Sequence, residues 1–182
     1  MSALTRETYC TYENWLDMEN PDGVWKMELI DGALYMMSAP STAHQGILAD
    51  LIRQFASYLL DKTCRVYPGI GVRLAKDTVY IPDITVICDM KKITKEVCEG
   101  SPDLIIEILS PSNIRHDTIT KYNAYLNARV NEYWIVNPEE RSVFVYRLKD
   151  GFYTVSVYDA HEIVPVMAFP DFELNLATVF QD

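Results

Sequence analysis

A single carboxylate inside an otherwise apolar stretch constrains the fold of this 182-residue chain more than any other feature. Between residues 104 and 109, every residue except Glu107 is leucine or isoleucine. Apolar residues on both faces are typical of a central strand that is covered on both sides. Because removing a carboxylate from water is costly unless a partner or a metal compensates, we predict that Glu107 has such a partner.

The hydrophobic patterns around this strand predict further strands, helices and two tight hairpins. Asp31-Gly32 and Asp150-Gly151 each separate two strand-like segments, and both dipeptides tolerate the positive φ of a hairpin turn. The predicted helices span residues 5–18, 44–60 and 114–128. The predicted strands span residues 27–30, 33–36, 65–67, 71–74, 84–88, 104–109, 133–136, 142–148 and 152–158.

This order of elements predicts an α/β fold: a mixed sheet with helices packed on it and antiparallel hairpins at its edges. The chain has no internal repeat and no Gly/Ser/Pro-rich linker. Its length suits one compact domain. We therefore expect a single domain over residues 1–182, with a core at about residues 25–160.

Several features bear on location and on metal type. Residues 1–20 carry four acidic side chains and no basic head before an apolar run, so we expect a cytoplasmic protein without a secretory signal. Its apolar stretches are too short to span a membrane. Cys10, Cys64, Cys88 and Cys98 form no CxxC pair, which argues against zinc. In a reducing compartment we expect all four to remain thiols.

The formal net charge of −10 restricts the classes of nucleic-acid-binding protein that fit. Nucleic-acid affinity comes largely from Lys and Arg side chains that neutralise phosphates, so a protein that coats DNA is disfavoured. An enzyme with a local basic groove and a metal remains possible, because the field at the site matters more than the total charge.

Asp83 is a second carboxylate that could act together with Glu107. It follows Pro82 and opens the apolar segment 84–88. If the two strands are neighbours, the two carboxylates could share Mg²⁺, which commonly takes one or two carboxylates plus waters. The alternative is that Pro82-Asp83 forms a turn into the strand and that Glu107 pairs with an arginine. Residue types alone leave both interpretations open.

Four segments together resemble the Uma-two family of candidate restriction endonucleases, in the PD-(D/E)XK nuclease superfamily. They are YIPDI at residues 80–84, PDLIIEILSPS at 102–112, Lys121 with Tyr125, and EYWIV at 132–136. ELIDG at residues 28–32 and SAP at 38–40, which leads to His44-Gln45, also match the family. The resemblance covers about residues 8–160.

The resemblance implies a restriction-endonuclease-like fold and an endonuclease that uses Mg²⁺ or Mn²⁺ to cleave DNA. Asp83 and Glu107 match the metal ligands of the superfamily. The superfamily places a lysine two residues after the glutamate, where this chain has Leu109. The family is thought to supply that lysine from the following helix, which makes Lys121 the candidate.

Three other residues are possible supporting members of the site, each with an ordinary alternative. Glu28 could add a carboxylate or be an exposed strand residue. His44 could approach a phosphate, but we favour an ordinary first-turn residue of a helix capped by Ser41 or Thr42. Asp117 could orient Lys121 or form a solvated ion pair with it. Tyr125 is expected to pack in the core or an interface.

Two classes of function therefore remain. The first is a metal-dependent DNA endonuclease built on Asp83, Glu107 and Lys121. The second is a non-catalytic interaction or DNA-associated protein on the same scaffold, expected as a homodimer or as a partner of mobile-element proteins, which Leu109 and the acidic charge favour. A functional site requires the three side chains to converge on one pocket, whereas an inactive relic does not.

Overall fold

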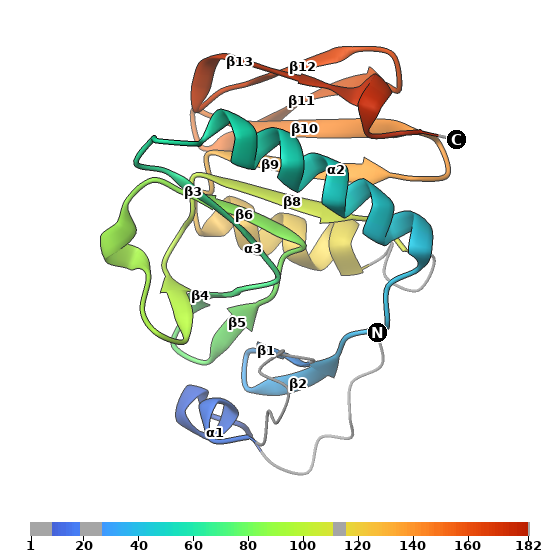
Figure 1. Cartoon of the computed structure of the whole chain (residues 1–182). Helices are drawn as coiled ribbons and strands as arrows, with labels where there is room; N and C mark the ends of the chain where they lie inside the picture. The colour runs from blue at the N-terminus through green and yellow to red at the C-terminus, as the bar shows by residue number, and fades with distance from the viewer. Residues whose placement is uncertain (1–8, 19–26, 111–115, 182) are drawn as a thin grey trace.

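A six-stranded mixed sheet forms the centre of the computed structural model, which describes residues 9–18, 27–110 and 116–181 (Figure 1). The strand order is β11-β10-β9-β8-β6-β3, and within this sheet only the pair β8 and β9 is parallel. The strands are β3 (Arg65–Pro68), β6 (Ile84–Ile87), β8 (Leu104–Ile108), β9 (Glu132–Asn137), β10 (Ser142–Lys149) and β11 (Phe152–Asp159). The predicted mixed α/β fold is confirmed.

Strand β8 lies inside this sheet, between β9 and β6, and all five of its residues are buried. Its side chains alternate between two hydrophobic clusters, as the pleat of a strand requires. Leu104, Ile106 and Ile108 belong to one cluster with helix α2, whereas Ile105 belongs to another with Tyr125 of helix α3. The prediction of a central strand covered on both faces is confirmed.

Two helices cover the opposite faces of the sheet (Figure 1). Helix α2 (Thr42–Tyr58) buries His44, Ile47, Leu51 and Phe55 at three- and four-residue spacing, close to the predicted range. A π-helical segment, His116–Lys121, leads into α3 (Tyr122–Asn127); the first residues of the predicted helix, 114 and 115, lie outside the described residues. No helix in the described part of the chain has the length and apolar character needed to cross a membrane.

A second sheet of five strands has the order β2-β1-β5-β4-β7. Asp31 (φ 49°) and Gly32 (φ 76°) form the predicted tight turn between β1 and β2. Glycine is required at position 32 for two reasons: its φ is positive, and a Cβ there would lie 2.2 Å from the Tyr9 ring. Strands β5 and β7 were not predicted, since three residues are too few to establish an alternating pattern. The strands are β1 (Met27–Ile30), β2 (Ala33–Met36), β4 (Gly71–Ala75), β5 (Thr78–Tyr80) and β7 (Val97–Glu99).

The first helix is shorter than predicted. Helix α1 spans Tyr12–Leu16, and the Thr11 side chain accepts a hydrogen bond from the Asn14 backbone N–H, which fixes the helix start. Residues 9–11 are therefore not helical, although the prediction began at residue 5; residues 5–8 lie outside the described residues. Asp77 holds this segment in place by accepting hydrogen bonds from the Tyr9 hydroxyl and the Tyr12 backbone N–H.

A C-terminal hairpin extends the core beyond residue 160, so the predicted core range was too short. Strands β12 (Ile163–Val166) and β13 (Phe169–Asn175) pair antiparallel and pack on α2. The Phe172 ring lies 5.2 Å from the Phe55 ring and 4.3 Å from the Tyr58 ring, measured between centroids. Buried residues continue as far as Phe180, in the turn formed after the short helix η3 (Leu176–Thr178).

The prediction that all four cysteines remain thiols is wrong for two of them. Cys64 and Cys88 form a disulfide, while Cys10 and Cys98 are free. The two half-cystines flank the antiparallel pair β3 and β6, one residue beyond the Arg65–Ile87 pair. Sequence spacing gave no sign of this contact, because the cysteines are 24 positions apart and the chain between them enters the second sheet and returns.

Candidate active site

The register of β6 and β8 places the two predicted carboxylates opposite each other. Ile84 pairs with Ile106 in this antiparallel ladder. Asp83 directly precedes Ile84 and Glu107 directly follows Ile106, so the two lie at the same end of this ladder, and both line one cavity. The condition that their strands be neighbours is confirmed. Like charges directly opposite each other destabilise a sheet, so this pair requires compensation.

Asp83 is held by the next strand and by the start of α2. Its Oδ2 accepts a hydrogen bond from the Ile108 backbone N–H at 2.7 Å and lies 3.2 Å from His44 Nε2. Ser41 caps α2, as expected, through a hydrogen bond from the His44 backbone N–H. The favoured interpretation of His44 as an ordinary first-turn residue was nevertheless incomplete, because its side chain is buried against Asp83.

Glu107 is compensated by groups from the π-helical segment and α3. Its Oε1 lies 2.8 Å from Lys121 Nζ and accepts a hydrogen bond from the Tyr125 hydroxyl at 2.7 Å. The partner is therefore a lysine rather than an arginine. Leu109, which occupies the position of the superfamily lysine, is buried in the cluster beside α3.

Glu28 is the second carboxylate on the Lys121 ammonium, so its interpretation as an exposed residue is wrong. Its side chain is fully buried in β1, where Oε1 lies 3.1 Å from Lys121 Nζ and accepts a hydrogen bond from the Ile81 backbone N–H at 2.9 Å. Two carboxylates thus contact one ammonium, and a backbone N–H holds one of these carboxylates. Such contacts are needed to offset the desolvation of buried ions.

The Tyr125 hydroxyl remains a hydrogen-bond donor at this site. Burial raises its pKa well above the ordinary value, and the negative charges of Glu107 and Glu28 raise it further. The sequence led us to expect Tyr125 in the core or an interface, without a contact to Glu107. Its spacing of four residues from Lys121 was the available signal, because positions four apart lie on one helical face.

Asp83, Glu107 and Lys121 line one small cavity of about 100 Å³. His44 contributes to the same wall. Glu28 lies behind Lys121 and does not line the cavity. The side chain of Asp117 is outside the described part of the structure, so its predicted role stays a prediction. The other lining residues are Met37, Ser38, Ala39, Pro40, Gln45, Ile108 and Ser110.

The donor set fits a hard divalent cation bound by two carboxylates. Asp83, Glu107 and Glu28 set three carboxylates against the single ammonium of Lys121, which leaves excess negative charge in this group. Among the residues that the structure describes, no group of three or more His, Cys, Asp or Glu side chains could hold a metal ion. Mg²⁺ suits such a sparse set, since it usually keeps several waters as ligands.

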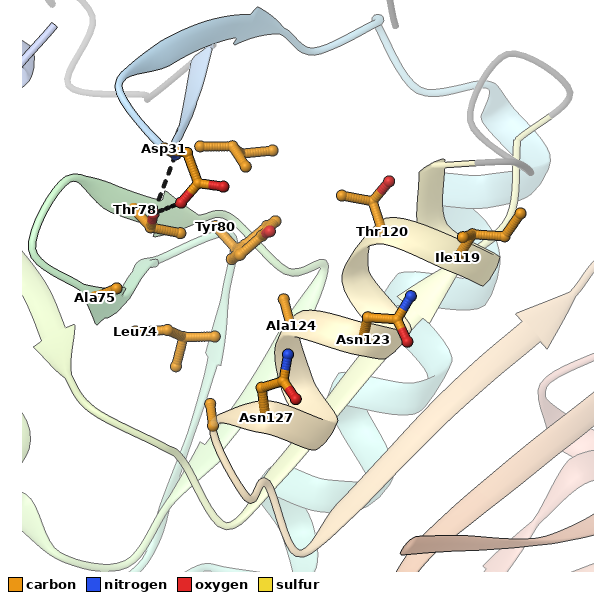
Figure 2. Close-up of a pocket in the computed structure, with 12 residues that line it drawn as sticks. Asp31, Leu74, Ala75, Thr78, Tyr80, Ile119, Thr120, Asn123, Ala124 and Asn127 are labelled. Carbon is orange, nitrogen blue, oxygen red and sulfur yellow. Dashed lines mark hydrogen bonds between the residues drawn. The ribbon is translucent and has the colours of Figure 1, made fainter.

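A larger cavity of about 550 Å³ lies between α3 and the second sheet (Figure 2). Asn123 and Asn127 of α3 face it from one side, while Asp31 and Thr78 face it from the other and are hydrogen-bonded to each other. The described residues that line it include no Lys or Arg and no member of the carboxylate pair. It is therefore separate from the candidate active site.

Fold and site together define a protein of the restriction-endonuclease-like class, with a core of mixed strands and paired carboxylates on adjacent strands. The chain belongs to the Uma2 family, described as "Putative restriction endonuclease", whose model matches residues 11–177. The predicted resemblance is confirmed.

Two known proteins are similar to this chain. An uncharacterized protein of Synechocystis, slr1290, is 26% identical over 141 residues, which cover 75% of this chain and 74% of that protein. A crystal structure of a protein from Anabaena variabilis, described as a "putative nuclease belonging to DUF820", has a TM-score of 0.76 at 23% identity. The superposition covers 93% of this chain and 97% of that one, and it establishes a shared fold.

Proposed function

We propose that this protein is a magnesium-dependent endonuclease that hydrolyses phosphodiester bonds in DNA. The observation that carries the proposal is that Asp83, Glu107 and Lys121, from three separate parts of the chain, line one cavity. The description of the family and that of the Anabaena protein both point to a nuclease. The proposed location is the cytoplasm, where DNA is accessible.

Asp83 and Glu107 would hold the Mg²⁺ or Mn²⁺ ion. When bound, the metal would lower the pKa of a water and offset negative charge on the phosphate. Lys121 would place a fixed positive charge beside the reacting phosphate, which favours the more negative transition state. Tyr125 and Glu28 would hold the Lys121–Glu107 pair in position through the contacts described above.

His44 would position Asp83 rather than act on the phosphate itself. Its Nε2 and the Ile108 backbone N–H both lie within hydrogen-bond reach of one oxygen, Asp83 Oδ2. These two contacts restrict the rotation of the carboxylate at the wall of the cavity. Positioning partners of this kind orient metal ligands and tune their affinity.

A second candidate function, a non-catalytic dimeric interaction protein, is favoured by the exposed edge of the central sheet. Strand β11 is the last strand of that sheet and exposes Phe152, Val155 and Val157. Its eight residues contain no Lys and no Pro, the residues that commonly protect an edge strand from pairing. Two copies related by a two-fold axis could pair through this edge.

Calorimetric titration of Mg²⁺ and Mn²⁺ is the first test of the proposal. We expect wild type to bind the metal, and we expect Asp83→Asn and Glu107→Gln to lose that binding because each removes one of only two carboxylate ligands. Glu139→Gln is the matched control and should bind like wild type, because Glu139 is an exposed turn residue that does not line the cavity. Absence of binding in wild type at millimolar metal would favour the non-catalytic function.

Cleavage of plasmid and oligonucleotide DNA is the second test. Metal-dependent cleavage by wild type should disappear in Glu107→Gln while the thermal unfolding transition is retained. Cleavage that persists in the variant would overturn the assignment of Glu107.

A further inference from the structure

A third cavity, of about 830 Å³, adjoins the candidate active site. The two cavities share the wall formed by residues 37–40, by Gln45 and by Asp83. The volume lies within the range of small-molecule sites, whereas the cavity at the carboxylates would hold little more than a phosphate and waters. A substrate with its phosphate at Asp83 would therefore place an adjoining group in the larger cavity.

The walls of this cavity suit a flat apolar group with a polar edge. Leu48 of α2, together with Ile70 and Ile81, supplies apolar surface. Gln45 is exposed in the first turn of α2, directly after the His44 that contacts Asp83. Its amide offers one acceptor and two donors, a combination that can pair with the edge of a nucleobase. Apolar walls with few polar groups are the usual composition of such a site.

The overall charge makes base recognition a more suitable source of affinity than phosphate contacts. With a net charge of −10, the protein is poorly suited to track a duplex along its phosphates. Lys95 lies at the cavity, but Glu96 lies beside it and offsets its charge. Binding a base in a pocket supplies affinity without a basic surface, and it requires a base that is already unstacked or easily unstacked.

We propose that this cavity binds the base of an unpaired nucleotide next to the scissile phosphate, so that the substrate is single-stranded or locally unpaired DNA. The inference rests on the proposed endonuclease function. Apolar surface from α2 and from the segment before β6 holds the base, and the Gln45 amide contacts its polar edge. Fully paired DNA binds weakly because its bases stay in the stack.

The test compares three fluorescently labelled DNAs of equal length: a duplex, the same duplex with one unpaired nucleotide, and a single strand. Binding is measured by fluorescence anisotropy in Ca²⁺, to limit cleavage. We expect wild type to bind the two unpaired substrates about tenfold more tightly than the duplex, the factor expected from one well-stacked base. Equal affinity for all three substrates would overturn the proposal.

Two variants and one matched control test whether the preference for unpaired DNA arises from this cavity. Leu48→Trp places an indole inside the cavity and should remove the preference for unpaired DNA. Ala49→Trp adds the same ring one position along α2, at an exposed residue that does not line the cavity, and should behave like wild type. Gln45→Ala keeps the cavity open and should weaken the preference by losing the amide contacts. A preference unchanged in both Leu48→Trp and Gln45→Ala would place the base elsewhere and overturn the proposal.

The proposal and the endonuclease function fail in different ways. Glu107-dependent cleavage of fully paired DNA without any preference for unpaired DNA would retain the endonuclease and exclude the base site. A preference that depends on Leu48, without cleavage in Mg²⁺ or Mn²⁺, would retain the base site and exclude the endonuclease.

Discussion

At the scale of single residues, the site depends on how buried charges are shared. Lys121 is only 2% exposed, and its ammonium lies between the carboxylates of Glu28 and Glu107. Neither carboxylate could remain ionised in the interior without a positive partner, since the effective cost of burying an ion is several kcal/mol. The lysine therefore has a structural role as well as the proposed catalytic one.

Replacing Lys121 by methionine tests this dual role. Lys121→Met should lower the free energy of unfolding by about 3–5 kcal/mol, because it leaves two buried carboxylates without their cation. Denaturant unfolding measures the loss. The double variant Glu28→Gln/Lys121→Met should recover part of it, since one of the two carboxylates is then neutral. A single variant as stable as wild type would show that the ion pairs contribute little to folding.

At the scale of elements, Glu132 connects two strands of the central sheet to the C-terminal hairpin. Its Oε1 accepts hydrogen bonds from Trp134 Nε1 at 3.1 Å and Arg147 Nε at 3.2 Å, and its Oε2 accepts one from the Met167 backbone N–H at 2.8 Å. Glu132, the first residue of the EYWIV motif, therefore has a structural role. Burial raises the Glu132 pKa above its ordinary value of 4.5, although the three donors act in the opposite direction.

This raised pKa gives a pH dependence of stability with a definite sign. Because the folded state holds the Glu132 proton more tightly than the unfolded state, its contribution is fully present below pH 4.5 and is lost as the pH rises through the folded pKa. The free energy of unfolding of wild type, minus that of Glu132→Gln, should therefore fall between pH 4.5 and the raised pKa. Denaturant unfolding of both proteins from acid to neutral pH measures it. A difference that grows with pH would mean that the donors outweigh burial.

The C-terminal hairpin contributes to stability through its contact with α2. Phe172→Ala removes the ring that packs on Phe55 and Tyr58, and should lower the free energy of unfolding by about 3–5 kcal/mol. Phe152→Ala is the matched control, because Phe152 is 73% exposed on β11 and should change stability by less than about 0.5 kcal/mol. Equal small effects of both variants would mean that the hairpin is not part of the cooperative core.

At the scale of the whole molecule, the Cys64–Cys88 disulfide closes a loop that includes Asp83 and two strands of the second sheet, β4 and β5. The link therefore restricts the unfolded chain around Asp83, one of the two proposed metal ligands. The remaining thiols are poorly reactive, because burial raises the pKa of Cys98 to about 11 and also raises that of Cys10.

Removing this disulfide should lower the free energy of unfolding by about 3 kcal/mol, from the entropy of the open loop. The double variant Cys64→Ser/Cys88→Ser, compared with wild type under non-reducing conditions, measures the loss. Cys10→Ser is the control, because Cys10 is free and should leave the transition near that of wild type. If unreduced wild type reacts with a thiol reagent at four cysteines after unfolding, the link is absent and the prediction fails.

Features encoded within a few neighbouring residues were predictable from the sequence. The Asp31-Gly32 and Asp150-Gly151 turns adopt positive φ because their residues tolerate it, and α2 follows from its three- and four-residue apolar spacing. The burial of β8 followed from its composition, and the metal pair was proposed from the lone Glu107 and from Asp83 after Pro82.

The partners of each buried charge were decided only by the tertiary structure. Which strand lies beside β8, and which helix crosses it, determine that Glu107 contacts Lys121 and that Glu28 lies on the far side of the same ammonium. The side-chain position of His44, the Cys64–Cys88 link and the C-terminal hairpin were likewise not predictable from local sequence patterns. The physical reason is that local patterns determine backbone conformation and the buried face, whereas contacts between distant residues depend on how the elements pack.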